Sequence, residues 1–434
     1  MRADVLLSGF VALCCASVSA QQDAPYLGDP IRYEVPTGND PVAKLADRLG
    51  KGELELDRDE RFGLLPALLS ALGALPSSQA LVFSKTSFQN ALISPRNPRA
   101  IYFGDDVYVG TVPGSPIFEL TSIDPVQGAI FYTLTDTKDG PPRIVRRDAE
   151  CLRCHALQWT DNWPGSMVRS VKPDRDGTPI MRLGSSVTTS DTPFDERWGG
   201  WYVTGTHGDA RHLGNLTLDD EPAPHIDREQ GANLTDLSKR CAIQRHLTPH
   251  SDLVALMVLE HQTRGHNLIA QTGYRTRLAL HRQQLADRAT GKPTQGLSDS
   301  TRAVLKDCTD ELIQFLLFRN ESLLPAPVAG TSSFTADFAA TGPRDREGRS
   351  LRTFDLQHRL FRYPCSYLIQ GEAFRTLPVE LRDMVLLRLL RILTGATGRR
   401  AYAHIGDEDR RVILRILVDT VVDLPQEWRD AVGH

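Results

Sequence analysis

The stretch Cys151-Leu152-Arg153-Cys154-His155 constrains this chain more than any other part of its sequence. In a C-x-x-C-H motif the two thiols are three residues apart, so both can add to vinyl groups on one side of a porphyrin. The residue that follows places an imidazole over the iron. Cysteine accounts for only 7 of the 434 residues, so a chance match is rare. The motif therefore predicts one covalently attached haem c, with His155 as the proximal iron ligand.

Two other interpretations of such a cysteine pair are a redox dithiol and half of a zinc site. A redox dithiol usually follows a strand and opens a helix of a thioredoxin-like βαβ unit, and no such unit is indicated around Cys151. A structural zinc site needs further ligands at a familiar spacing, and the sequence has no second Cys-x-x-Cys pair. Haem attachment is therefore the favoured interpretation.

The first 20 residues have the pattern of a secretory signal peptide. Arg2 gives a short basic start, residues 5–18 are mostly apolar, and Val18-Ser19-Ala20 supplies the small side chains that a signal peptidase requires. No later segment has about 18 uninterrupted apolar residues, the length that a membrane-spanning helix needs. We therefore expect cleavage near Ala20 and a periplasmic or secreted mature protein without an integral membrane segment.

The overall composition is that of an ordinary soluble globular protein. Hydrophobic residues make up 41% of the chain and charged residues 24%, with a net charge of −4, so no basic excess indicates a nucleic-acid partner. Outside the signal and the motif, three cysteines remain, Cys241, Cys308 and Cys365. An exported protein can form one disulfide among them, but the sequence does not choose the pair. Because all three lie in apolar surroundings, buried free thiols are the simpler interpretation.

The apolar pattern predicts an α+β chain in which a small, mostly antiparallel β-rich domain carries the haem and an α-helical domain follows. We place the signal at 1–20, an irregular lead-in with a short helix at 21–75, the β-rich domain at 76–230 and the helical domain at 235–425. Strands are indicated by β-branched and aromatic runs between turn residues. These runs are Ala80–Phe83, Ala100–Phe103, Val107–Val112, Ile117–Leu120 and Ala129–Leu134, with further strands at Met181–Leu183 and Trp201–Thr206.

Helical periodicity replaces strand periodicity after residue 235. Ser251 or Asp252 is a suitable N-cap for a long helix that reaches Ala286, and Ser298 can cap another that ends near Phe318. Further helices are expected at Arg61–Leu75, Leu377–Thr394 and Glu408–Val422, whereas Gly330–Arg352 is expected to be mainly loop.

The residue opposite His155 decides whether the iron is closed or open to small ligands. Met167 and Met181 follow the motif, and His207 and His212 flank a polar loop. A loop histidine is more often solvated or hydrogen-bonded than bound to a metal. Among these residues we favour His207 or His212 over Met181 as the sixth ligand.

His261 and His266 lie in the middle of the long predicted helix. At 100° per residue they stand about 140° apart around the helix axis, so one metal ion cannot easily bind both. His261 shares a stripe with apolar residues, which favours a packed core histidine. The alternative is that one of the two reaches the haem face from the helical domain.

Arg169 and Arg197 are candidates to pair the haem propionates, because a guanidinium can hold a carboxylate through two hydrogen bonds. Surface ion pairing is the alternative for both. Four of the five tryptophans lie within 50 residues of the motif and predict an aromatic core around a bulky cofactor. They are Trp159, Trp163, Trp198 and Trp201.

Four longer segments are also distinctive. They are LVFSKTS at 81–87, AIYF with DDVYVG at 100–110, ERWGGWYVTGTHG at 196–208 and FRYPCSYLI at 361–369. With the motif, they resemble a group of exported bacterial proteins that have a monohaem c-type cytochrome domain of unknown function, over about residues 75 to 425. The resemblance implies export and haem binding through Cys151, Cys154 and His155, and it implies no particular activity.

Electron transfer in the periplasm, with a redox partner protein, is the function that these features favour. One haem carries one electron, and the sequence has none of the common hydrolase, phosphate-binding or dinucleotide-binding motifs. One alternative is a haem-based redox or gas sensor that acts with a partner. Another is a peroxidase-like oxidoreductase in which His207, His212 or His261 acts as the acid–base group.

Overall fold

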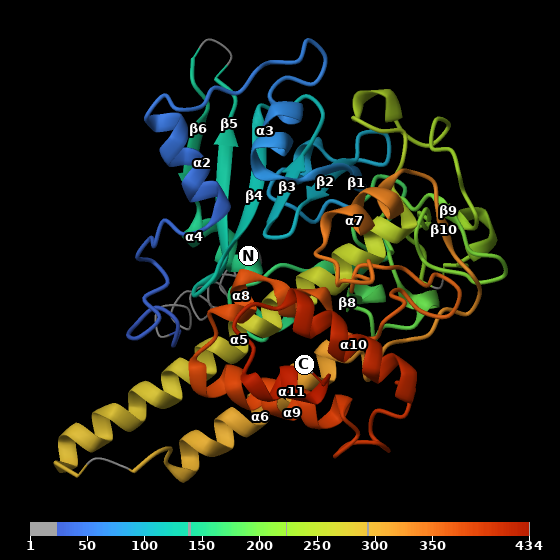
Figure 1. Cartoon of the computed structure of the whole chain (residues 1–434). Coiled ribbons are helices and arrows are strands. Elements are labelled where there is room, and N and C mark those ends of the chain that lie inside the picture. Colours follow the sequence, from blue (N-terminus) through green and yellow to red (C-terminus); the bar gives the residue numbers. More distant parts are fainter. Residues whose placement is uncertain (1–23, 138–139, 223, 293–294, 434) are drawn as a thin grey trace, which may run out of the picture.

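The computed structural model describes residues 24–137, 140–222, 224–292 and 295–433, so the expected signal at 1–20 lies outside the described residues. The chain is α+β, with an antiparallel six-stranded sheet in its N-terminal half and a largely helical C-terminal region (Figure 1). The strands lie side by side in chain order. They are β1 (Leu75–Val82), β2 (Arg99–Phe103), β3 (Val107–Thr111), β4 (Ile117–Asp124), β5 (Gly128–Thr135) and β6 (Arg143–Arg146).

α2 (Pro41–Gly50) and α3 (Leu65–Leu72) lie against one face of this sheet (Figure 1). Asp40 caps α2 by accepting hydrogen bonds from amides of its first turn, and Pro41 takes the first position, where a missing amide proton costs nothing. Asp40 also accepts a hydrogen bond from Tyr132 on β5 (2.8 Å), which joins the helix to the sheet. The prediction of an irregular lead-in is therefore wrong over residues 41–50.

α5 (Leu253–Thr290) crosses the opposite face of the sheet. Asp252 caps this helix, as one of the two predicted caps, by accepting from the amides of the first turn. The first half of α5 is buried nearly all round, because it lies between the sheet and other helices. Its second half extends away from the sheet beside α6 (Asp299–Leu316), which Ser298 caps as predicted (Figure 1).

The remaining helices pack mainly around α5 and α6, and α9, α10 and α11 lie on the side of α5 away from the sheet (Figure 1). The buried apolar side chains of the sheet and of the helical region form one continuous cluster. The helices are α7 (Phe334–Thr341), α8 (Glu372–Arg375), α9 (Val379–Leu393), α10 (Asp407–Thr420) and α11 (Gln426–Ala431).

The structure confirms the first five predicted strands and the predicted helices, with bounds that differ by a few residues. Residues 181–183 form a 3-10 helix instead of a strand, because Gly184 takes a positive φ and turns the chain. Within the predicted strand Trp201–Thr206, only β9 (Gly205–Thr206) is a strand, and it pairs with β10 (Ala329–Gly330). The backbone N–H and carbonyl of Val203 are hydrogen-bonded to the side chain of Asn215, so they are not available for strand pairing. α7 lies inside 330–352, which was predicted to be mainly loop. A second small hairpin, β7 (Val168–Val171) and β8 (Ser185–Thr188), follows the motif.

Two further predictions concern the membrane and the thiols. Within the described ranges, no helix combines the length and the apolar character needed to cross a bilayer. Cys241, Cys308 and Cys365 are buried and unpaired, as the simpler interpretation of their sequence surroundings predicts. Burial raises the pKa of each thiol, to about 11 or 12, so all three stay protonated at neutral pH.

Candidate haem site

α4 (Asp148–His155) carries the whole C-x-x-C-H motif and follows directly on β6, an edge strand of the sheet. An ion pair between Arg146 and Asp148 (2.6 Å) joins the strand to the first turn of the helix. Cys151 and Cys154 are three residues apart on α4, so their thiols lie on one side of it. Cys151 is half-buried and Cys154 is exposed, and both thiols are free, as attachment to a porphyrin requires.

The imidazole of His155 is oriented by one backbone carbonyl. Its Nδ1 lies 2.9 Å from the carbonyl oxygen of Gly165, and because a carbonyl only accepts, Nδ1 carries the proton. The lone pair of the neutral ring is then on Nε2, the arrangement found in metal-binding histidines. Burial lowers the pKa of His155 and so favours this neutral form. The ring packs on Phe131 of β5, with the two centroids 4.6 Å apart.

The loop that supplies this carbonyl is clamped to α5. The side chain of Asn267 donates to the carbonyl oxygen of Ser166 (2.7 Å) and accepts from the amide of the same residue (3.0 Å). One turn further along α5, Gln271 donates to the carbonyl oxygen of Thr160 (3.0 Å). α5 therefore fixes the position of Gly165, and through it the orientation of the His155 ring.

A Gly165→Ala substitution tests this clamp. A Cβ at position 165 would lie 2.5 Å from the side-chain oxygen of Asn267, so the loop or Asn267 must move. We expect a loss of about 1–3 kcal/mol in the free energy of unfolding, the usual cost of overpacking, measured by urea denaturation. Gly50→Ala is the control, because a Cβ there meets no atom within 4 Å. Equal losses in the two variants would contradict the clamp.

Next to α4, part of the sheet face that α5 crosses is incompletely covered. Ile101 on β2 and Glu119 and Thr121 on β4 are half-buried, whereas their neighbours on the same strands are buried. Burial, and after it the charge of Glu119, raises the pKa of Cys151 to about 12, so Glu119 lies close to the motif. Arg99 pairs with Glu119 across this surface (2.6 Å). A half-open surface beside two free thiols and a neutral imidazole fits a covalently attached haem.

Arg169, on β7, lies beside the motif. Its guanidinium stands 5.4 Å from the ring centroid of Trp159 and donates Nη2 to the hydroxyl of Ser185 (3.0 Å). Burial lowers the pKa of Arg169, and the nearby Cys154 opposes this shift. Among the described residues its Nε is buried without a hydrogen-bond partner. An unpaired guanidinium N–H at this position fits a carboxylate of the cofactor, the role that the sequence suggests for Arg169.

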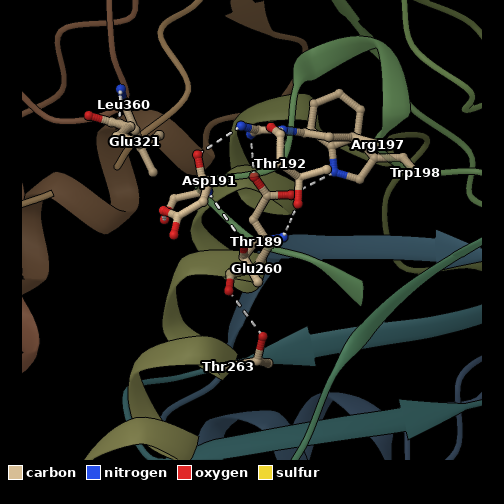
Figure 2. A network of polar contacts seen from close by, with 10 residues as sticks. Thr189, Asp191, Thr192, Arg197, Trp198, Glu260, Thr263, Glu321 and Leu360 are labelled. Atoms are coloured by element: carbon tan, nitrogen blue, oxygen red, sulfur yellow. Dashed lines mark hydrogen bonds and ion pairs between the residues drawn. The ribbon is translucent and has the colours of Figure 1, made fainter. Parts of the chain in front are cut away.

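Arg197 has a different partner. It forms an ion pair with Glu260 on α5, and it donates Nε to the carbonyl oxygen of Thr192 (2.8 Å) and Nη2 to that of Ser190 (3.1 Å) (Figure 2). Trp198 donates its indole N–H to the second carboxylate oxygen of Glu260 (3.0 Å). Only 2% of the Arg197 side chain and 1% of Glu260 are exposed. The carboxylate that Arg197 binds in this structure is therefore Glu260, in place of the propionate suggested by the sequence.

His207 and His212 are buried, and their rings lie against each other with centroids 4.8 Å apart. In His207, Nδ1 lies 2.8 Å from the carbonyl oxygen of Ala210 and Nε2 accepts from the amide of Asn233 (2.9 Å). In His212, Nδ1 accepts from the amide of Gly214 (3.0 Å), so the proton is on Nε2. Neither ring offers a free lone pair to iron in this arrangement, because the nearby backbone already binds it.

The two histidines of α5 are also buried, in separate surroundings. His261 is stacked between Phe315 and Phe318, at centroid distances of 4.9 and 4.7 Å, which makes it the core histidine that its apolar stripe predicts. His266 faces the sheet, and its Nδ1 lies 2.9 Å from the hydroxyl of Tyr108. Burial lowers the pKa of His261 to about 3 and that of His266 to about 4, so both are neutral at pH 7.

The two methionines named as possible ligands differ in how exposed they are. Met181 is 76% exposed, whereas Met167 is half-buried just before β7. Over the parts of the chain that the structure describes, no cluster of three or more His, Cys, Asp or Glu side chains could hold a metal ion by itself. Iron at this site would therefore depend on a bound haem, which Cys151 and Cys154 would attach and His155 would ligate.

Gly165, Glu119 and Arg99 surround the motif in space and were not predicted from the sequence. No local pattern marks them, because the strand register and the clamp on α5 bring them there. No protein-family model matches the chain, and no curated protein and no solved structure matches it either. The arrangement of its own residues is therefore the basis for assigning a function.

Proposed function

We propose that this chain is an exported c-type cytochrome that carries one haem on α4 and exchanges electrons with a partner protein in the periplasm. The observation that carries the proposal is the pair of free thiols followed by a neutral imidazole whose Nε2 lone pair is available. When bound, the haem supplies a one-electron redox couple. Cys151 and Cys154 attach it, His155 binds the iron, and Gly165 holds the His155 ring in place.

The exposure of the attachment helix supports exchange with a protein partner. Cys154 is exposed and α4 follows an edge strand, so a redox partner can approach this edge without any opening of the fold. The charges of Arg153 and Glu150, both exposed on α4, offer polar contacts at the rim of such an encounter. Export is proposed from the sequence of residues 1–20.

A second candidate is a haem protein with an open sixth position, either a sensor or a peroxidase-like oxidoreductase. The observation that favours it is the state of the histidine rings: His207 and His212 have no free lone pair, and His261 is enclosed by two phenylalanines. An iron without a second strong protein ligand would bind small molecules.

Optical spectra of the purified mature protein test the proposal. We expect a c-type pyridine haemochrome and, for an electron carrier, low-spin bands in both redox states that carbon monoxide does not change. High-spin bands and rapid carbon monoxide binding would instead favour a sensor or an oxidoreductase. A protein matured in a cell that attaches haem c, yet free of haem, would refute both candidates.

A further inference from the structure

A chain of polar side chains runs from solvent into the interior on the sheet face that α5 crosses. Asp106 lies 3.9 Å from Nε2 of His266 (carboxylate to ring nitrogen), and Nδ1 of His266 lies 2.9 Å from the hydroxyl of Tyr108. Gln262 donates to that hydroxyl (3.3 Å) and accepts from Tyr367 (2.7 Å). Since the Tyr108 oxygen accepts from Gln262, its proton is free for Nδ1, and the Nε2 proton then points to Asp106.

Asp106 is the end of this chain that solvent reaches. Its side chain is 36% exposed, and it lines a cavity of about 40 Å³. Burial, followed by the charges of Asp105 and Glu372, raises the pKa of Asp106 to about 6. The titratable and charged groups that face Asp106 and His266 come from α2, α5, α8 and two loops: Lys44, His261, Glu372, Asp105 and Arg352.

One structural link joins His266 to the proximal histidine through α5. Asn267 follows His266 directly and holds both backbone groups of Ser166. The preceding residue, Gly165, supplies the carbonyl that accepts the proton of His155 Nδ1. Two hydrogen-bonded contacts therefore connect the His155 ring to His266: the contact between His155 and Gly165, and the contact between Ser166 and Asn267.

A second link runs across the sheet. Tyr108 on β3 is paired with Thr121 on β4, and Thr121 is paired with Phe131 on β5, so the three side chains lie in one row on one face. Neighbouring strands are about 4.8 Å apart, which places Tyr108 about 10 Å from Phe131. The ring of Phe131 contacts His155. The row therefore has the Tyr108–His266 hydrogen bond at one end and the Phe131–His155 ring contact at the other.

We infer that Asp106 and His266 form a proton-accepting site that is coupled to electron transfer at His155. The inference rests on the proposed function. Reduction of a haem bound at His155 would oxidise the redox partner by one electron and add one negative charge beside His155, and the Asp106–His266 pair would bind a proton from solvent that offsets part of that charge. The bond that forms is O–H on Asp106 or N–H on His266, and reoxidation releases the proton.

Proton uptake during reduction of the haem-loaded protein tests this inference. With a pH-sensitive dye, we expect uptake of a fraction of a proton per electron, largest near pH 6, where Asp106 titrates. Asp106→Asn and His266→Gln should each lose this uptake, and the reduction potential of each should lose its dependence on pH near pH 6. Asp161→Asn is the control, since Asp161 is 65% exposed near the motif, pairs with Arg264 (3.7 Å) and should leave the uptake intact.

The outcomes separate this inference from the function on which it rests. A haemochrome with unchanged uptake in both Asp106→Asn and His266→Gln would assign the protons to other groups, such as the propionates, and overturn the inference alone. A native protein that carries haem but takes up no proton would do the same. Absence of haem would refute the proposed function and the inference with it.

Discussion

Arg197→Met is expected to lower the free energy of unfolding, by up to about 3–5 kcal/mol at alkaline pH where Glu260 is charged, the cost of removing one partner of a buried ion pair. Among the described residues, the variant leaves Trp198 as the remaining side-chain donor to the Glu260 carboxylate (Figure 2). It also removes the donor to the carbonyl group of Thr192, whereas the carbonyl group of Ser190 keeps the amide of Ser322 (2.9 Å). Met fills similar space with no charge. Urea denaturation followed by tryptophan fluorescence measures the loss, because Trp198 reports on this environment.

The loss should also depend on pH, in a direction set by Glu260. Burial raises the pKa of Glu260 to about 7 in the folded protein, with Arg197 and Trp198 opposing, against 4.5 for a free carboxyl. The folded state therefore binds more protons than the unfolded state between these values, and stability falls as pH rises through that window. Without Arg197 the folded-state pKa rises further. The difference between variant and native protein should then grow as pH rises above 7.

Two comparisons isolate the ion pair. The double variant Arg197→Met with Glu260→Gln should recover part of the loss, because it leaves no unpaired buried carboxylate. Arg175→Met is the matched control: Arg175 pairs with Asp219 at 2.6 Å, but both side chains are more than half exposed, so little change is expected. A loss in Arg197→Met no greater than in Arg175→Met would show that the buried pair contributes no net stability.

Sequence alone predicted the elements whose signals are local. Regular β-branched runs marked β1 to β5, and capping residues such as Asp252 and Ser298 marked the starts of α5 and α6. α2 also carries a local signal, the pair Asp40-Pro41, which could have identified it. β6 carries none, because its Arg-Ile-Val-Arg sequence lacks alternation and its edge position leaves it mostly half-buried.

The candidate site likewise combines residues that a local pattern marks with residues that only the fold brings together. The proposed attachment residues Cys151, Cys154 and His155 were identified from their spacing, a purely local pattern. The carbonyl of Gly165 lies ten residues from His155, and its clamp, Asn267, about 100 residues further along the chain. Arg197 shows the consequence: its charge indicated a carboxylate partner, but only the packing of α5 identifies that partner as Glu260, 63 residues away.

Replacing both motif thiols, Cys151→Ser with Cys154→Ser, is expected to abolish covalent haem while the chain still folds. A serine hydroxyl does not form the thioether bond that a thiol forms with a vinyl group, so haem staining on a denaturing gel should disappear. Each single variant should keep one thioether and a haemochrome band shifted by the unreacted vinyl group. Staining of the double variant equal to that of the native protein would refute attachment at α4.

The two thiols are not deeply buried, so loss of haem in the variants can be separated from loss of folding. Cys154 is exposed and Cys151 only half-buried, so serine at either position removes little packing, and circular dichroism should be unchanged. Cys308→Ser is the converse control: Cys308 is buried on α6, and a hydroxyl there should cost stability while haem stays attached. Loss of haem with fold retained in one variant, and loss of stability with haem retained in the other, would assign attachment to α4 independently of folding.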